Sequence, residues 1–334
     1  MIYNNIDFNN KTILITGGAG FIGSNLAFYF QENFPNSKVI VFDCFRSDEI
    51  FPNGNQKTFG HFKNLIGFKG IVICGNINNK HDLARLNNFN IDFIFHQAAI
   101  SDTRVYDQQI IFKTNVNSFY DLLEIAKHNH AAMVYASSAA TYGNQPSPQT
   151  IGNENPENPY GYSKYLMDQI AYRYSIENPE MTIVGLKFFN VYGPREYYKA
   201  KTASIVIQIG HQILDNKAPK LFEGSDQIFR DFINIKDVIQ ANIKACSPKQ
   251  NGVYNIGTGY PRSFQDIANI LQKELGTNLG NNYIANPYND YQVHTQADIS
   301  SSKVNLKFEP TISLEQGIIE YIPEIKRLHG TSSS

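Results

Sequence analysis

The chain has 334 residues, a length that predicts two domains or one large α/β unit with a smaller partner. Hydrophobic residues make up 42% and charged residues 18% of the chain, a composition that excludes an intrinsically disordered protein. The 29 Lys and Arg residues nearly balance the 30 Asp and Glu residues, so the net charge of −1 excludes the diffuse attraction typical of nucleic-acid and membrane-surface binders.

The N-terminal residues 1–11 are polar and include an acidic residue, whereas a secretory signal begins basic and continues apolar. No apolar run approaches the roughly 20 residues that span a bilayer. We therefore predict a cytoplasmic protein with neither a membrane nor nucleic acid as a partner. Cys44, Cys74 and Cys246 are far apart and odd in number, so we expect reduced core cysteines and no disulfide framework or metal site.

Short apolar runs alternate with longer segments in the first half of the chain. The first run, residues 12–16, precedes a glycine cluster and a helical pattern over about 24–32. Further strands are predicted at residues 38–43, 71–74, 91–97, 132–137 and 182–189. The stretches between them are long enough for crossover helices, and this alternation predicts a parallel sheet covered on both faces.

Beyond Asn190 the pattern changes to mixed loops and helices punctuated by glycine and proline. We predict an α/β fold: a Rossmann-type doubly wound parallel sheet with a smaller, mixed α/β substrate domain. The dinucleotide-binding domain is expected over residues 1–190 with a return segment at about 228–254. The substrate-binding domain is expected over residues 191–227 and 255–330.

Gly17, Gly20 and Gly23 lie between the first predicted strand and the first predicted helix. In such a turn the first glycine permits a tight bend, the second lets the backbone approach a pyrophosphate, and the third lets helix and strand pack closely. Asp43 follows at the end of the second strand, about 20 residues on, which is the spacing of a carboxylate that binds an adenosine ribose. The sequence therefore predicts a dinucleotide site.

The choice between NAD and NADP rests on two conflicting residues. Asp43 favours a free ribose hydroxyl, whereas Arg46 is able to pair with a 2′-phosphate. A solvated loop charge is an equally good interpretation of Arg46.

Tyr160 and Lys164 are four residues apart, so on a helix they lie on one face. A lysine ammonium stabilises a nearby phenolate, which predicts that Tyr160 exchanges a proton with a substrate hydroxyl while hydride moves to a nicotinamide. Ser138 follows a predicted strand and is placed to hydrogen-bond the same oxygen. Capping or turn chemistry is the alternative interpretation of Ser137 and Ser138.

Together these motifs resemble the extended short-chain dehydrogenase/reductases, the group of nucleotide-sugar epimerases and dehydratases. The resemblance covers nearly the whole chain and includes residues 95–99, Asn115 and residues 189–195. It implies a tightly held nicotinamide cofactor, a nucleotide-diphosphate sugar substrate and a homo-oligomer. The cofactor-binding residues that it implies are Gly17, Gly20, Phe21, Ile22, Gly23, Asp43, Arg46, Asn76, Ile77, Gln97, Ala98, Ala99, Asn115, Tyr160 and Lys164.

Within that group, residues 135–143, 193–199, 221–232 and 294–298 are most similar to the ADP-glyceromanno-heptose 6-epimerases. That similarity implies inversion of C6 through a 6-keto intermediate, with Tyr160 and Lys199 as the two proton-handling residues. Lys164 is expected to hold the nicotinamide ribose and to tune Tyr160. The implied substrate-binding residues are Ser138, Asn190, Lys199, Lys220, Arg230 and Tyr291.

Some of these substrate residues have a clear chemical role, whereas others have an equally good interpretation without a ligand. Arg230 suits a diphosphate, because a guanidinium grips two phosphate oxygens. Lys199 and Lys220 are equally typical of solvated loop charges, and Tyr291 of packing.

The chain departs from many relatives at Asn76-Ile77, where they carry an aspartate that holds the adenine amine. The side-chain carbonyl of Asn76 is still able to accept that hydrogen bond, without the charge. The family favours NADP whereas Asp43 keeps NAD open, so we predict NADP with NAD as the alternative.

Three other functions are compatible with parts of the pattern. A 4,6-dehydratase needs an acidic pair where this chain has Ala139 and Ala140. A UDP- or GDP-sugar 4-epimerase would use Ser138, Tyr160 and Lys164 equally well, but Lys199 and its context favour the 6-epimerase. A redox-sensing binding protein of the same fold would normally lack the tyrosine and lysine.

Overall fold

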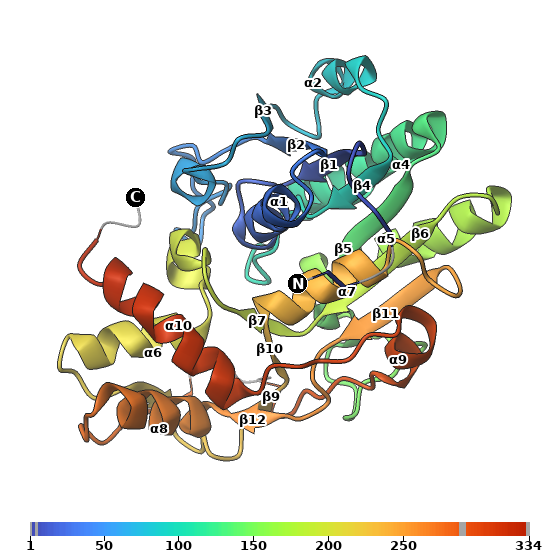
Figure 1. Cartoon of the computed structure of the whole chain (residues 1–334). Coiled ribbons are helices and arrows are strands. Elements are labelled where there is room, and N and C mark those ends of the chain that lie inside the picture. The colour runs from blue at the N-terminus through green and yellow to red at the C-terminus, as the bar shows by residue number, and fades with distance from the viewer. Residues whose placement is uncertain (1, 4–5, 287–291, 332–334) are drawn as a thin grey trace.

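The computed structural model of the chain describes residues 2–3, 6–286 and 292–331. In this part of the chain, seven parallel strands form one sheet in the order β11-β6-β5-β4-β1-β2-β3 (Figure 1). They are β1 (Thr12–Thr16), β2 (Lys38–Asp43), β3 (Ile71–Cys74), β4 (Phe93–His96), β5 (Ala132–Ser138), β6 (Ile183–Phe188) and β11 (Gly252–Ile256). The predicted α/β class with a doubly wound parallel sheet is confirmed.

Both faces of the sheet are covered by helices, because alternate strand residues point to opposite sides. Ile13 and Ile15 of β1 belong to a core with α1 (Phe21–Asn33) and α7 (Ile235–Lys244). Leu14, between them, belongs to a second core with α4 (Ser118–Asn129) and α5 (Pro159–Glu177). The strands therefore read as continuous apolar runs.

Shorter elements connect the strands and helices. The helices are α2 (Lys80–Ala84), α3 (Gln108–Phe112) and α9 (Ser300–Leu306), with a π-helical turn, η3 (Lys113–Asn117), joining α3 to α4. The 3₁₀ turns are η1 (Phe62–Leu65), η2 (Arg85–Asn88), η4 (Ala139–Tyr142) and η5 (Tyr197–Thr202).

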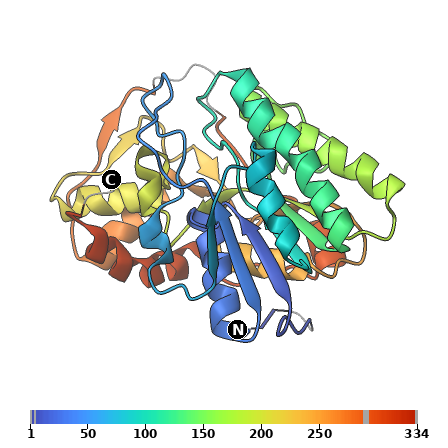
Figure 2. The ribbon, with the colours of Figure 1, turned by 90° about the horizontal axis from the view of Figure 1, so that it is seen from above.

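A second, smaller unit lies on the side away from α4 and α5 in both views (Figures 1 and 2). Its helices α6 (Ile205–Leu214), α8 (Phe264–Leu275) and α10 (Leu314–Leu328) share an apolar core that includes Val206, Leu271 and Ile318. Short strand pairs join them: β7 (Asn190–Tyr192) with β10 (Phe232–Asn234), β8 (Lys220–Phe222) with β13 (Asn282–Ile284), and β9 (Phe229–Arg230) with β12 (Arg262–Ser263).

The chain returns from this unit to the sheet. From β10 it enters α7, which packs against α1, and then β11, which pairs with β6. Asp231 stabilises the crossing point: its buried carboxylate accepts hydrogen bonds from the backbone of Thr258, Gly259 and Ala297 at 2.6–2.9 Å. Three segments distant in sequence are thereby joined.

Two local expectations need correction. Helix α1 begins at Phe21 and not at Ser24, because Gly20 adopts an extended conformation as its N-cap and the glycine turn runs directly into the helix. Cys246 is in the core as expected, but Cys44 and Cys74 are exposed because they stand where β2 and β3 leave the sheet. Among the described helices, none combines the length and apolar character needed to cross a membrane.

Candidate active site

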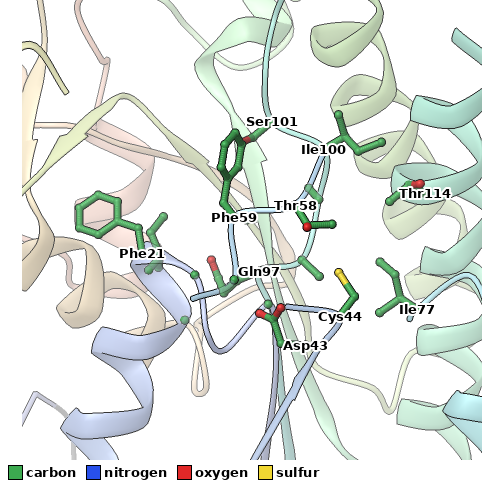
Figure 3. Close-up of a pocket in the computed structure, with 18 of the residues that line it drawn as sticks. Phe21, Asp43, Cys44, Thr58, Phe59, Ile77, Gln97, Ile100, Ser101 and Thr114 are labelled. Atoms are coloured by element: carbon green, nitrogen blue, oxygen red, sulfur yellow. The ribbon is translucent and has the colours of Figure 1, made fainter. Parts of the chain in front are cut away.

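A cavity of about 690 Å³ opens at the carboxyl ends of the sheet strands, where the loops after β1, β2, β4 and β5 meet (Figure 3). Open α/β sheets bind their ligands at this edge. The predicted residues that line it are Gly17, Gly20, Phe21, Ile22, Gly23, Asp43, Asn76, Ile77, Gln97, Ala98, Ala99, Ser138, Tyr160, Lys164 and Lys199. Residues spread over most of the chain's first 200 positions thus converge on one space.

A second cavity of about 400 Å³ is lined by residues of the smaller unit, among them Asn190, Ser204 and Phe264. Phe189, Val191 and Lys199 line both cavities, so the two adjoin at Lys199. The arrangement provides space for a dinucleotide along the sheet edge and for a second ligand beside it.

The glycine turn has no room for side chains. A Cβ atom on Gly23 would lie 2.3 Å from the carbonyl oxygen of Gly17, and Gly17 itself has a φ of +68°. The turn ends at Gly20, the N-cap of α1, which has no side chain to cap the helix. The free amides of this helix start suit the pyrophosphate of a dinucleotide.

Asp43 ties this turn to the end of β2. Its Oδ2 atom accepts a hydrogen bond from the amide of Ala19 at 2.9 Å, and Oδ1 accepts one from the amide of Phe45 at 2.8 Å. Burial raises the pKa of the carboxyl group, and these two amides oppose the rise. Asp43 therefore shapes the turn as well as lining the cavity where Figure 3 shows it beside Cys44.

Tyr160 and Lys164 lie on the first two turns of α5, which Asn158 caps by accepting from the amide of Gly161 at 2.9 Å. Burial raises the pKa of Tyr160, and a hydrogen bond with the Ser138 side chain lowers it. The Nζ atom of Lys164 donates to the carbonyl oxygen of Ala136 at 2.7 Å. Burial lowers the pKa of Lys164 to about 8, so the lysine is mostly protonated at neutral pH and loses its charge slightly above it.

Ser138 combines both interpretations of its sequence position. As the N-cap of η4 it accepts a hydrogen bond from the amide of Ala140 at 3.1 Å, and it also reaches Tyr160. Behind it, His96 is buried and shares a hydrogen bond of 2.7 Å with Thr16 Oγ1. Burial, with the nearby charge of Lys164, lowers the pKa of His96 to about 3, so this ring stays neutral.

A buried ion cluster behind Lys164 escaped the sequence analysis. Asp168, one helical turn further along α5, accepts hydrogen bonds from Tyr135 and Ser137, both at 2.9 Å, and from Lys187 at 2.6 Å. Lys187 also lies 3.3 Å from Glu154. The i, i+4 spacing of Lys164 and Asp168 was visible in the sequence, but Lys187 sits inside an apolar strand pattern.

Lys199 lies on η5, with its Nζ atom 5.8 Å from the centre of the Phe21 ring. Burial lowers its pKa, whereas the negative charges of Glu196 and Asp102 raise it. The buried Glu196 accepts hydrogen bonds from the Ser204 amide at 2.6 Å and the Ser204 hydroxyl at 2.7 Å, which shapes the turn. Lys199 is half-buried and lines both cavities, unlike a fully solvated loop lysine.

The other predicted residues that the structure describes are not part of the first cavity's wall. Arg46 donates to the carbonyl oxygen of Tyr198, and Asn115 is buried against Ile100 and Ser163. Lys220 is the exposed first residue of β8. The remaining two predicted residues are Arg230, which donates to the carbonyl oxygens of Phe229 and Gln292, and Tyr291, which lies outside the described residues.

Comparison with known proteins places the chain among sugar-nucleotide enzymes. The sequence matches the NAD dependent epimerase/dehydratase family over residues 13–257. It is 34% identical to the ADP-L-glycero-D-manno-heptose-6-epimerase of Brachyspira hyodysenteriae over 327 residues, 95% of this chain and 99% of that protein. The structure is similar to that of the Helicobacter pylori ADP-L-glycero-D-manno-heptose-6-epimerase, with a TM-score of 0.89 and 49% identity over 98% of this chain and 99% of that one.

A 4-epimerase of the same fold is also similar. The Bacillus cereus UDP-glucuronic acid 4-epimerase, in complex with UDP-glucuronic acid and NAD, has a TM-score of 0.80 and 29% identity over 95% of this chain and 99% of that one.

The close approach at Gly23 leads to a test of the dinucleotide site. We expect Gly23→Ala to lose bound nicotinamide nucleotide, because the new Cβ would clash with the backbone of Gly17 and displace the turn. Nucleotide released from equal amounts of heat-denatured protein is the measurement. Gly276→Ala is the control, since Gly276 has a φ of +70° but open space around it: this variant loses stability and keeps its nucleotide. Full nucleotide content in Gly23→Ala would refute the assignment.

Proposed function

Because the chain belongs to the NAD dependent epimerase/dehydratase family, as its motifs predict, we propose that it inverts C6 of ADP-glycero-manno-heptose through a 6-keto intermediate. The observation that carries this proposal is the position of Lys199. It lies on η5 at the junction of the two cavities, while Tyr160 enters the first cavity from α5. Two proton-handling groups on different elements suit a carbon that exposes one face for oxidation and the other for reduction.

A nicotinamide dinucleotide fits the first cavity, which joins a tightly packed glycine turn at a helix start to the Tyr160 site. When bound, its nicotinamide ring accepts hydride from the sugar carbon and returns it. In the proposed mechanism Tyr160 or Lys199 removes the C6 hydroxyl proton, and after the ketone rotates the other residue donates a proton. Lys164 keeps a positive charge beside Tyr160, which favours the phenolate. The reaction is redox-neutral, and the proton gained by one residue and lost by the other is restored by exchange with solvent before the next turnover.

We propose NADP as the cofactor, with NAD as the alternative. The segment between β2 and η1 brings Lys57, which pairs with Glu49 at 2.8 Å, and the hydroxyls of Ser47 and Thr58 into the cavity wall; these donors support a phosphate on the adenosine ribose. Arg46, in contrast, is engaged with Tyr198. The family name and the Bacillus cereus complex refer to NAD, so the extracted nucleotide decides this point.

Three further expectations remain proposals. Residues 1–190 with 228–254 would hold the dinucleotide, and residues 191–227 with 255–330 the sugar, as the two adjoining cavities suggest. We propose the cytoplasm as the compartment, because both ligands are intracellular metabolites and Cys44, Cys74 and Cys246 are free thiols. We also propose a homo-oligomer, which light scattering would test.

The function is tested by incubating the purified protein, without added cofactor, with ADP-D-glycero-β-D-manno-heptose and following the C6 configuration by NMR. We expect an equilibrium mixture with the L-glycero form. Extraction of the bound nucleotide in parallel distinguishes NADP from NAD. No conversion by a cofactor-loaded preparation that epimerises a UDP- or GDP-sugar would contradict the substrate and favour a 4-epimerase.

Tyr160→Phe removes the hydroxyl that exchanges the substrate proton. We expect kcat to fall by about a hundredfold to ten-thousandfold, the usual contribution of a positioned general acid or base, while bound nucleotide is retained. Tyr162→Phe is the matched control, because Tyr162 lies on the same helix and is 43% exposed. Wild-type kcat in Tyr160→Phe would overturn the mechanism.

Asp168→Asn should shift the pH dependence of kcat/KM. The Asp168 charge raises the pKa of both Tyr160 and Lys164, so its removal lowers both pKa values. Tyr160 then ionises at lower pH and Lys164 loses its charge at lower pH, so both limbs of the profile move toward acid. Asp121→Asn, which breaks an exposed pair with Lys80, should leave the profile unchanged. Limbs that stay in place or move toward alkaline pH would contradict the prediction.

A further inference from the structure

The segment between β2 and η1, residues 44–60, crosses the cavity wall; we call it the strap. Its tip is a tight hairpin, in which Ile50 and Gln56 pair in antiparallel fashion and the amide of Phe51 donates to the carbonyl oxygen of Asn55 at 2.7 Å. The strap lines the cavity from its start at Cys44 to its end at Gly60. It is therefore an ordered part of the site.

The loop after β4, residues 97–107, which we call the facing loop, lines the same cavity. Figure 3 labels Thr58 and Phe59 of the strap and Ile100 and Ser101 of the facing loop among the side chains that line the cavity. The glycine turn, β2 and the β4 end form the floor between them. A ligand in the cavity would thus be bordered by both segments.

The two segments are joined through Asp102 of the facing loop. Its Oδ2 atom accepts hydrogen bonds from the side-chain amides of Asn55 and, at 3.1 Å, of Asn53, both in the strap hairpin. Its Oδ1 atom accepts from the backbone amide and the Nε atom of Arg104 at 3.0 and 3.1 Å. Asp102 and Asn55 are only 6% and 8% exposed, so the link is shielded from competing water.

Apolar packing supports the same link. Phe51 at the hairpin tip is 4% exposed and packs with Ile100 and Val105 of the facing loop and with Ile111 of α3. This small cluster is separate from the two cores of the sheet. The strap and the facing loop therefore close a ring around the cavity, with the Asn55–Asp102 hydrogen bond as its polar fastening.

The proposed reaction explains why such a ring is useful. An epimerase that oxidises and then reduces one carbon needs the same dinucleotide for both steps, because loss of the reduced dinucleotide would strand the ketone. A dehydrogenase that releases its cofactor in each cycle has the opposite need. Retention beyond the lifetime of the intermediate is thus a requirement of the chemistry.

We propose that Asn55 and Asp102 are positioning residues that hold the strap closed over the bound nicotinamide dinucleotide, so that it stays in place between the two half-reactions. This inference rests on the proposed function, because only an epimerase needs to keep the dinucleotide between two half-reactions. The rate of dinucleotide release itself can be measured whatever the substrate is.

The test measures exchange of bound dinucleotide in the purified full-length protein. Protein saturated with radiolabelled NADP, or with NAD if extraction identifies it, is mixed with excess unlabelled dinucleotide, and retained label is followed by rapid desalting. We expect Asn55→Ala and Asp102→Asn to shorten the exchange half-time about tenfold, the factor for one hydrogen bond to a charged group. If either of these buried variants fails to fold, Asn53→Ala replaces it in the test, because Asn53 is exposed and donates the second hydrogen bond to Asp102.

Asn9→Ala is the matched control. Asn9 donates a side-chain hydrogen bond to Asp7 at 2.9 Å on the N-terminal surface, so the variant loses the same kind of bond far from the cavity. We expect its half-time to equal that of the wild type. During turnover without added cofactor, the strap variants should lose activity progressively and regain it when oxidised dinucleotide is added, which a misfolded variant would not do.

A wild-type exchange rate in the folded strap variants would overturn the proposal. The proposed function is tested separately. If the protein converts no ADP-heptose but the strap variants still exchange faster, the role of Asn55 and Asp102 is supported and the substrate assignment is contradicted.

Discussion

The buried ammonium group of Lys164 is the constraint on which the rest of the site depends. A buried charge persists only where neighbouring groups offset the loss of hydration. One partner is the carbonyl oxygen of Ala136, 2.7 Å away, and the other contribution is the Asp168 charge, which raises the pKa of Lys164. Asp168 in turn is held by Lys187 on β6. The phenol of Tyr160 therefore works beside a chain of buried charges that runs from α5 across the sheet.

The parallel sheet makes this convergence possible. Because all seven strands of the described sheet run the same way, their carboxyl ends meet at one edge, and Asp43 and Ser138 arrive there on β2 and β5. The two cores hold these strand ends between helices on both faces. Groups on rigid strands thus form the floor of the site. The less regular strap and η5 contribute its walls.

Local patterns predicted the floor but not the walls. The strands, the glycine turn and the Tyr160–Lys164 pair are encoded over a few residues, so periodicity and spacing were sufficient. Arg46 donates a hydrogen bond to Tyr198, about 150 residues away in the sequence. The strap contacts the facing loop through hydrogen bonds between side-chain amides and the Asp102 carboxylate, which no sequence pattern predicts. Lys187 was hidden because its neighbours in β6 are apolar and only the fold reveals its partners. Cys44 and Cys74 were expected in the core because cysteine is usually buried, although the predicted strands 38–43 and 71–74 already placed both at strand ends.

Asp102 joins the two parts of the proposed cycle. Although burial alone raises its pKa, the hydrogen bonds from Asn55 and Arg104 bring that pKa below its ordinary value, so the carboxylate is charged at neutral pH. This charge raises the pKa of Lys199, against the effect of burial. Opening of the strap would remove the Asn55 bond and expose Asp102 to water, which weakens its influence on Lys199. Asp102 therefore joins the strap to the facing loop and also contributes to the charge environment of Lys199, whichever of the two proton transfers Lys199 performs.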